Sequence, residues 1–199
     1  MSRPGLVLPN GCRVTHGAGA TIKRPLPGVD LEMHELHPGG GPAFNGQLGF
    51  IAFRSDYRLP RHIHMSELEG GRRRLLPERI LALNGVALVE LCGEVLVVAP
   101  GTLVDIPPGV PHTWTACPAG VRLPDGTRAD GTFLMIYDYA EPTGFFTTAA
   151  TTTLADPADY VGTPDGAEPV TFPDLAAEDV VACCACVIDT TLSRELTLA

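Results

Sequence analysis

The sequence predicts an all-β fold built from many short strands. Glycine and proline are abundant, at 22 and 19 of the 199 residues, as expected for strands that are joined by tight turns. From Glu78 onward, short apolar segments follow one another closely and are separated by Gly, Asn or Pro: residues 79–83, 86–91, 94–98 and 103–106. Apolar runs of this length between turn signals are typical of strands.

The chain before Glu78 is less regular. Residues 1–29 are rich in Gly and Pro and predict an irregular arm with at most a short strand. Three further strands are expected where apolar and polar residues alternate or apolar residues cluster, at residues 31–36, 48–53 and 58–64. Residues 65–77 contain Gly70 and Gly71 and predict a long hairpin loop.

The turn before His112 is rigid. Proline fixes φ and glycine accepts positive φ, so Pro107, Pro108 and Gly109 can aim the following imidazole inward. Beyond this turn we expect a strand over residues 112–115, an added hairpin over 118–131 and a last barrel strand over 133–139. A surface tail over 147–172 and a short helix over 175–183, capped by Asp174, should follow.

These elements predict one domain with an extension at each end. The length of 199 residues suffices for a single domain with a substantial core. We expect an N-terminal arm over residues 1–29, a barrel over 30–146 and a C-terminal extension over 147–199 that packs on the barrel.

Composition restricts the class of partner. The net charge is −9 and Lys23 is the only lysine, which argues against nucleic acid or an anionic membrane as the main partner. No apolar run is long enough to span a bilayer, and the N-terminus lacks the features of a signal peptide, so we expect a cytoplasmic protein that acts on a small molecule.

Three histidines stand out as candidate metal ligands. His62 and His64 are two residues apart, and residues at that spacing on a strand point to the same face. A third imidazole and a carboxylate from neighbouring strands would complete a metal site.

Two motifs resemble those of the cupin superfamily. The second cupin motif reads Gly, five residues, Pro-x-Gly, two residues, His, three residues, Asn; it is matched at Gly101, Pro107, Gly109 and His112, with Ala116 in place of the Asn. The first reads Gly, five residues, His-x-His, three or four residues, Glu, six residues, Gly; it is matched in part at His62, His64, Glu78 and Gly85. Asp56 replaces its leading Gly, and thirteen residues separate His64 from Glu78.

The resemblance implies a small single-domain, metal-binding cupin. The fold would be an antiparallel jelly-roll barrel with a metal near its centre, held by His62, His64, Glu78 and His112. Small single-barrel cupins commonly pair, and the long arms of this chain could cover a partner's sheet edge, so we also expect a homodimer.

The fourth ligand has two candidates. Glu69 satisfies the short gap after His64, whereas Glu78 satisfies the six-residue gap to Gly85. Glu78 leads directly into an apolar strand and Glu69 into Gly70-Gly71. Strands hold ligands more firmly than loops, so Glu78 is favoured.

Other clusters have simpler interpretations. His34 and His37 are three residues apart, which does not suit a pair on one strand, and we interpret them as surface or inter-strand histidines. Cys183, Cys184 and Cys186 lack a fourth zinc ligand nearby and are interpreted as buried apolar thiols. Arg72, Arg73 and Arg74 are interpreted as a solvated basic turn, with capture of an anionic substrate as the alternative.

Three imidazoles and one carboxylate suit a divalent first-row metal and leave two open positions in an octahedral shell. Fe(II) is favoured, with Mn, Ni, Co, Cu and Zn as alternatives. The favoured activity is that of a dioxygenase acting on a small aromatic, enolic or dicarbonyl compound. A metal-dependent isomerase, lyase or cyclase is the first alternative, and a non-catalytic small-molecule-binding cupin the second.

The strands near the candidate metal ligands suggest residues for a substrate pocket. If their side chains face inward, Trp114, Phe133, Met135 and Tyr137 would line an apolar pocket; ordinary core packing is the alternative. Tyr57, Tyr137 and Tyr139 are the candidate general bases.

Overall fold

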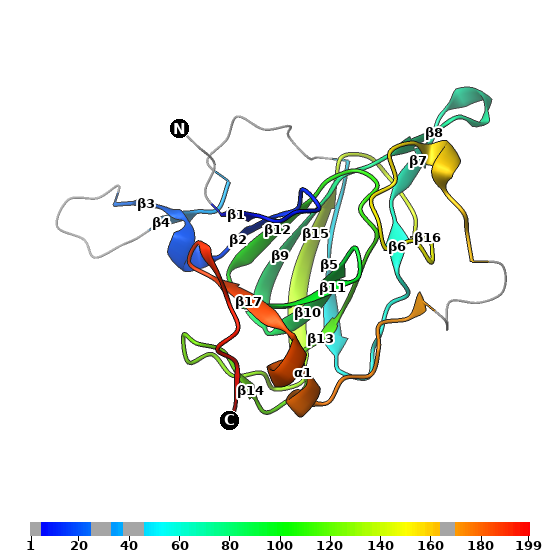
Figure 1. Cartoon of the computed structure of the whole chain (residues 1–199). Coiled ribbons are helices and arrows are strands. Elements are labelled where there is room, and N and C mark those ends of the chain that lie inside the picture. The colour runs from blue at the N-terminus through cyan, green and yellow to red at the C-terminus, as the bar shows by residue number, and fades with distance from the viewer. Residues whose placement is uncertain (1–4, 25–32, 38–45, 164–169) are drawn as a thin grey trace.

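The computed structural model describes residues 5–24, 33–37, 46–163 and 170–199. Within these ranges the chain is mostly β-strand (Figure 1). The other regular elements are helix α1 (Ala177–Cys183) and the 3₁₀ turns η1 (Gly17–Gly19), η2 (Glu69–Gly71) and η3 (Pro157–Asp159). The predicted all-β fold is confirmed.

Two sheets form the barrel. The six-stranded sheet contains, in spatial order, β1 (Leu6–Val7), β2 (Arg13–Thr15), β12 (Thr102–Ile106), β9 (Glu78–Gly85), β15 (Thr132–Tyr139) and β5 (Gln47–Arg54). The seven-stranded sheet contains β16 (Phe146–Thr147), β6 (His62–Ile63), β13 (His112–Ala116), β10 (Ala87–Leu91), β11 (Glu94–Val98), β17 (Ala185–Ile188) and β18 (Thr191–Ser193). This double-sheet arrangement is a jelly-roll barrel.

Three smaller strand pairs lie outside these sheets. They are β3 (Thr21–Lys23) with β4 (Met33–Glu35), β7 (Met65–Glu67) with β8 (Arg73–Leu75), and β14 (Val121–Arg122) with β19 (Thr197–Leu198). The β7–β8 pair is the predicted hairpin over residues 65–77, and it projects from one end of the barrel (Figure 1). Of the strand predicted at residues 31–36, β4 forms and residues 31–32 lie outside the described part of the chain.

The segments predicted as strands at residues 86–91 and 94–98 form the hairpin of β10 and β11. Its turn residues Cys92 and Gly93 have φ values of 53° and 86°. A two-residue turn of the type that matches the twist of the strands requires positive φ at both positions, and glycine supplies it without strain.

The barrel interior is filled by alternate residues of both sheets. On β9, Ile80 and Ala82 are fully buried, and Phe133 and Met135 of β15 pack beside them. Trp114 of β13 is 1% exposed and joins the same cluster. Side chains at every second position point the same way on a strand, so the inward face of each sheet supplies this core.

A second apolar core covers the outer face of the seven-stranded sheet. Leu88, Val97 and Cys186 on that face pack in one cluster with Phe172 and with Val180 of α1. The C-terminal segment thus forms a third layer over the strands that carry His112.

The C-terminal segment differs from its prediction in two respects. Asp174 is not the helix cap: α1 is preceded by Ala176, whose N–H donates to the Asp179 carboxylate at 3.0 Å, and Asp174 pairs instead with Arg58 at 3.4 Å. The strands β17 and β18 were not predicted, and β17 pairs in parallel with β11. Parallel pairing brings together segments far apart in sequence and leaves no local turn signal.

The predicted strand over residues 58–64 is shorter than expected. Only His62 and Ile63 form β6, because the strand is interrupted at His64 and β7 begins at Met65. His62 and His64 nevertheless both face the interior.

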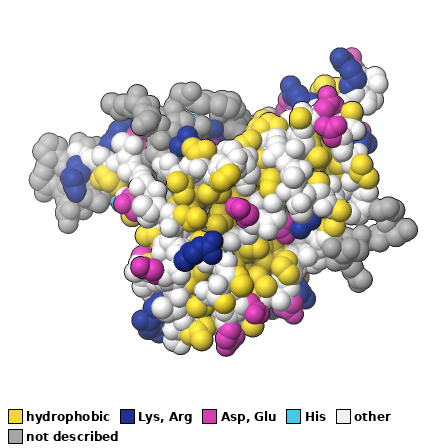
Figure 2. All heavy atoms as spheres, viewed as in Figure 1, with side chains coloured by type: hydrophobic (Ala, Val, Ile, Leu, Met, Phe, Trp, Pro, Cys, Tyr) yellow, Lys and Arg dark blue, Asp and Glu magenta, His cyan; other side chains and the backbone are white. Residues whose placement is uncertain are grey.

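On the face shown in Figure 2, acidic and basic side chains are scattered among apolar ones and form no dense basic patch. Within the described ranges, no helix has the length and apolar character needed to cross a membrane.

We expect the homodimer to use the free edge of β5. In the described part of the chain β5 pairs only with β15, and its Leu48 is 71% exposed. Leu48→Asp should weaken dimerisation roughly tenfold or more, because two like charges would meet across a symmetric interface. Sedimentation or light scattering at micromolar concentration measures this shift.

Val161→Asp is the matched control, since Val161 is 74% exposed but lies outside the strands. It should leave the dimer unchanged. A mass of 21.0 kDa for the unmodified chain would contradict the dimer itself.

Candidate metal site

The structure brings the three predicted histidines to one buried point. His62 on β6 lies directly opposite His112 on β13 in the antiparallel register, and His64 follows two residues after His62. Each is at most 2% exposed. One ring nitrogen from each lies within 4.8 Å of the others, so this cluster can hold a metal ion.

Backbone carbonyls orient all three imidazoles. The Nδ1 atom of His62 lies 2.8 Å from the Pro60 carbonyl, and that of His112 lies 2.8 Å from the Val110 carbonyl. The Nδ1 atom of His64 lies 3.1 Å from the carbonyl of Gly144. A carbonyl only accepts, so each Nδ1 carries the proton and each Nε2 presents its lone pair, which is the tautomer that a metal requires.

Glu78 approaches two of these nitrogens. Its Oε2 atom is 2.7 Å from Nε2 of His112 and 3.4 Å from Nε2 of His64. All three atoms are buried, and none has a hydrogen-bond partner. Lone pairs that face each other in a buried site repel unless a cation lies among them, so the donor set fits a divalent metal.

The electrostatics favour the ligand forms of these groups. Burial lowers the pKa of His62 well below its ordinary value, and the neighbouring His112 and His64 lower it further. Burial alone raises the pKa of Glu78, but positive charge on the facing imidazoles of His64 and His112, when they are protonated, outweighs burial and lowers that pKa below its ordinary value. The site therefore combines a neutral imidazole at His62 with a carboxylate at Glu78.

Glu69, the alternative fourth ligand, lies elsewhere. It begins the exposed turn η2 at the tip of the β7–β8 hairpin. Glu78 instead starts β9, where it pairs with Ile106 of β12 and Tyr139 of β15.

The four residues predicted for the substrate pocket occupy different places. Three of them face inward, as the pocket prediction supposed, but they pack together in the barrel core and do not line a pocket beside the histidines: Trp114, Phe133 and Met135. Tyr137 lines a pocket of about 150 Å³ beside His64. That pocket also involves residues that the spacing arguments did not select as pocket walls: Gln47, Phe50, Ile51, Tyr139, Thr143, Gly144 and Phe145.

Two of those residues touch the histidines directly. The Phe145 ring is centred 4.4 Å from that of His62, and the Tyr139 ring 4.5 Å from that of His64. Burial, and then the neighbouring Glu78 carboxylate, raise the pKa of Tyr139 above its ordinary value. Tyr139 was predicted only as a candidate base, and Phe145 follows the strands with no motif to mark it.

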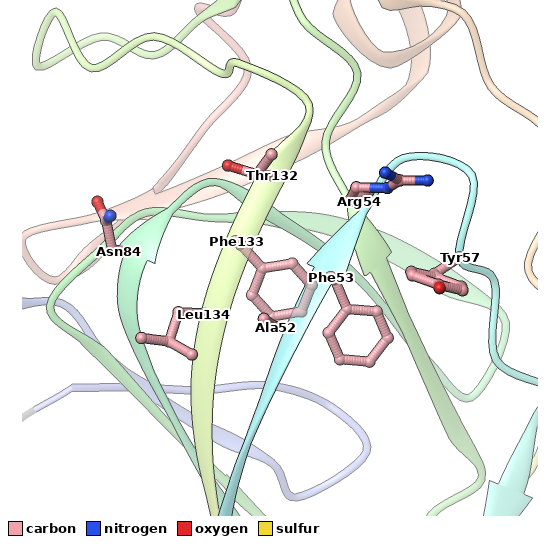
Figure 3. A pocket seen from close by; sticks show the side chains of 8 residues that line it. All are labelled: Ala52, Phe53, Arg54, Tyr57, Asn84, Thr132, Phe133 and Leu134. Carbon is pink, nitrogen blue, oxygen red and sulfur yellow. The ribbon is translucent and has the colours of Figure 1, made fainter.

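A larger pocket, of about 470 Å³, lies at the other end of the six-stranded sheet (Figure 3). Phe133 lines it and pairs with Gly85, at the end of β9 opposite Glu78. Tyr57, also a predicted candidate base, lies here, beside an Arg54 guanidinium that Asp56 already neutralises. This pocket is therefore remote from the metal ligands.

The remaining clusters have other partners. Arg73 and Arg74 of the predicted basic turn pair with Glu67 and Glu141. His34 contacts the Gly17 carbonyl, and His37 contacts Arg79. Cys184 and Cys186 are buried and Cys183 is exposed, and within the described ranges the histidines form the only potential metal cluster of three or more such residues.

Comparison with known proteins gives no sequence match. No protein-family model matches the chain, and no curated protein does. Solved structures with a similar fold include a cupin 2 domain-containing protein from Halorhodospira halophila, at 17% identity, with a TM-score of 0.37 and coverage of 70% of this chain and 84% of that one.

Two enzymes of known description are also similar in structure. A dTDP-6-deoxy-D-glucose-3,5-epimerase from Legionella pneumophila has 10% identity, a TM-score of 0.47, and coverage of 77% and 82% of the two chains. The polyketide cyclase RemF from Streptomyces resistomycificus has 18% identity, a TM-score of 0.32, and coverage of 69% and 87%. Likeness at this level does not assign a reaction.

The fold and the site together define the class of protein: a small jelly-roll barrel with a buried cluster of three histidines that could hold a metal ion.

Replacing His62 and His64 together by Ala should abolish metal binding, because two of the three converging nitrogens are lost. Elemental analysis of the purified protein should fall from about one metal per chain to a trace. His34→Ala is the control and should keep full metal content. A double variant with unchanged occupancy would contradict the site.

Glu78→Gln should weaken metal binding by roughly tenfold to a hundredfold, because a neutral amide is a poorer ligand than a carboxylate. Glu69→Gln should change it little. Competition with a chelator of known affinity measures both, and the reverse order of effects would assign the fourth ligand to the hairpin.

Proposed function

We propose that this protein is a metal-dependent cupin enzyme, and that it is a dioxygenase acting on a small aromatic, enolic or dicarbonyl compound. The observation that carries the proposal is the convergence of one ring nitrogen from each of three buried histidines, with the Glu78 carboxylate beside two of them. Fe(II) is the proposed metal, held by His62, His64, His112 and Glu78.

When bound, Fe(II) would supply redox chemistry and two neighbouring open coordination positions. The chain supplies the surroundings. The histidines are nearly inaccessible to water, and the Phe145 ring lies against His62. The core of Trp114, Phe133 and Met135 closes the barrel behind the site. An apolar enclosure protects reactive species from side reactions with water.

A metal-dependent isomerase, lyase or cyclase is the second candidate. The observation that favours it is Tyr139, which lines the pocket beside His64 and whose ring centre lies 4.5 Å from that of His64. A tyrosine hydroxyl at this position can hydrogen-bond to a substrate oxygen and stabilise the charge that develops there during isomerisation or elimination.

Oxygen dependence separates the two candidates. The metal-analysed protein is incubated with small aromatic and dicarbonyl compounds in air and under strict anaerobiosis, and oxygen uptake and product are measured. We expect oxygen consumption with substrate, no product without oxygen, and loss of turnover on chelation. The variant lacking His62 and His64 is the control.

Equal product formation in both atmospheres would replace the dioxygenase by the isomerase, lyase or cyclase. A stoichiometrically metal-loaded protein that binds such compounds without converting them would support the non-catalytic cupin.

A further inference from the structure

The pocket beside His64 has properties that restrict the ligand. It lies between β5, β15 and the segment of residues 143–145, and has a volume of about 150 Å³. A cavity of about 150 Å³ accepts a single benzene-sized ring. The pocket adjoins the proposed metal ligand His64, so the inference below rests on the proposed function.

Aromatic side chains form the walls. Tyr137 and Tyr139 have ring centroids 5.2 Å apart, and Phe145 covers His62. Phe145 and Phe50 are 52% and 73% exposed, so both keep apolar surface available to a ligand. Aromatic walls favour a planar ring, since offset and edge contacts between rings are favourable.

Gly49 on β5 fixes one of these walls. A Cβ at this position would collide with the Tyr137 side chain. The absence of a side chain at Gly49 therefore lets the Tyr137 ring lie flat along β5 and face the pocket.

The polar groups of the pocket are uncharged. The Gln47 side-chain oxygen accepts from the Thr143 N–H at 3.0 Å, so its amide N–H groups remain to donate to a ligand. The Thr143 hydroxyl is occupied by the Met65 carbonyl at 2.7 Å. No Lys, Arg, Asp or Glu lines the pocket among the described residues.

This polarity disfavours a phosphorylated ligand. Phosphate groups are bound by guanidinium or ammonium groups or by helix N-termini. Arg74, on the adjoining hairpin, already pairs with Glu141. A ligand that presents carbonyl or hydroxyl oxygens to Gln47 and to the metal ligands needs no such partner.

We infer that this pocket, rather than one lined by Trp114, Phe133 and Met135, binds the substrate, and that the substrate is a monocyclic, non-phosphorylated ring with vicinal oxygen donors. Its oxygens face the histidines and its ring lies against Tyr137 and Phe145. Phe145 determines specificity by limiting ring size.

The test measures binding without turnover. Protein loaded with Zn(II) is titrated by calorimetry with catechol, with naphthalene-2,3-diol, which has the same donor pair and one more ring, and with phenyl phosphate. Catechol should bind roughly tenfold or more tightly than naphthalene-2,3-diol, since a misfit of one ring costs at least that factor. It should also bind more tightly than phenyl phosphate, whose charge meets no Lys or Arg in the pocket lining.

Phe145→Ala should reverse part of this preference: the affinity for catechol should fall and the affinity for naphthalene-2,3-diol should rise. Gln47→Leu should weaken the binding of both diols, because both present the same oxygens to its amide group. Tyr57→Ala, in the remote pocket of Figure 3, is the control and should change neither ligand.

Metal content is measured on every sample. A chain that takes up no Zn(II) would overturn the proposed metal site itself. Full metal content with equal affinity for the two diols would overturn only the assignment of this pocket as the substrate site. A ratio of the two affinities that Phe145→Ala leaves unchanged would do the same. Binding of phenyl phosphate as tight as that of catechol would overturn the assigned ligand class.

Discussion

The candidate metal site depends on three hydrogen bonds that fix the orientation of the imidazole rings. Each ties a histidine Nδ1 to a backbone carbonyl and leaves the Nε2 lone pair pointing into the barrel. With Glu78 beside two of them, the result is a buried group of acceptors without donors. Such a group is destabilising in a packed protein unless a cation binds it, so the fold maintains this arrangement at a cost in stability.

The rest of the barrel holds these rings in place. The antiparallel pairing of β13 with β6 and β10 sets the height of His112, and β9 sets that of Glu78 between β12 and β15. The C-terminal layer covers the back of the same sheet through Phe172 and Val180. Packing on both faces leaves β13 little freedom, which suits a strand that must place a ligand accurately.

Much of the metal site could be predicted because its signals are local. The two-residue spacing of His62 and His64, and the Pro-x-Gly turn before His112, each act within a few residues. The strand after Glu78 favoured it over Glu69 for a similar reason. The pocket beside His64 could not be predicted in this way. Gly144 contacts His64 although 80 residues separate them in the sequence, and no periodicity encodes that contact. Inward facing was correctly considered for Trp114, but whether inward side chains leave a cavity depends on how their volumes fit.

The segment from Thr143 to Phe145 contacts both the histidine cluster and the adjoining pocket. Its Gly144 carbonyl orients His64, its Phe145 ring covers His62, and its Thr143 N–H holds Gln47. The same three residues therefore set the direction of one ligand nitrogen and the shape of the adjoining pocket. A ligand that displaced Phe145 would also disturb the Gly144 contact, because adjacent residues share one backbone. If the proposed metal and substrate bind as inferred, substrate fit and metal geometry would be coupled in this barrel, and selection among ring sizes would act on both at once.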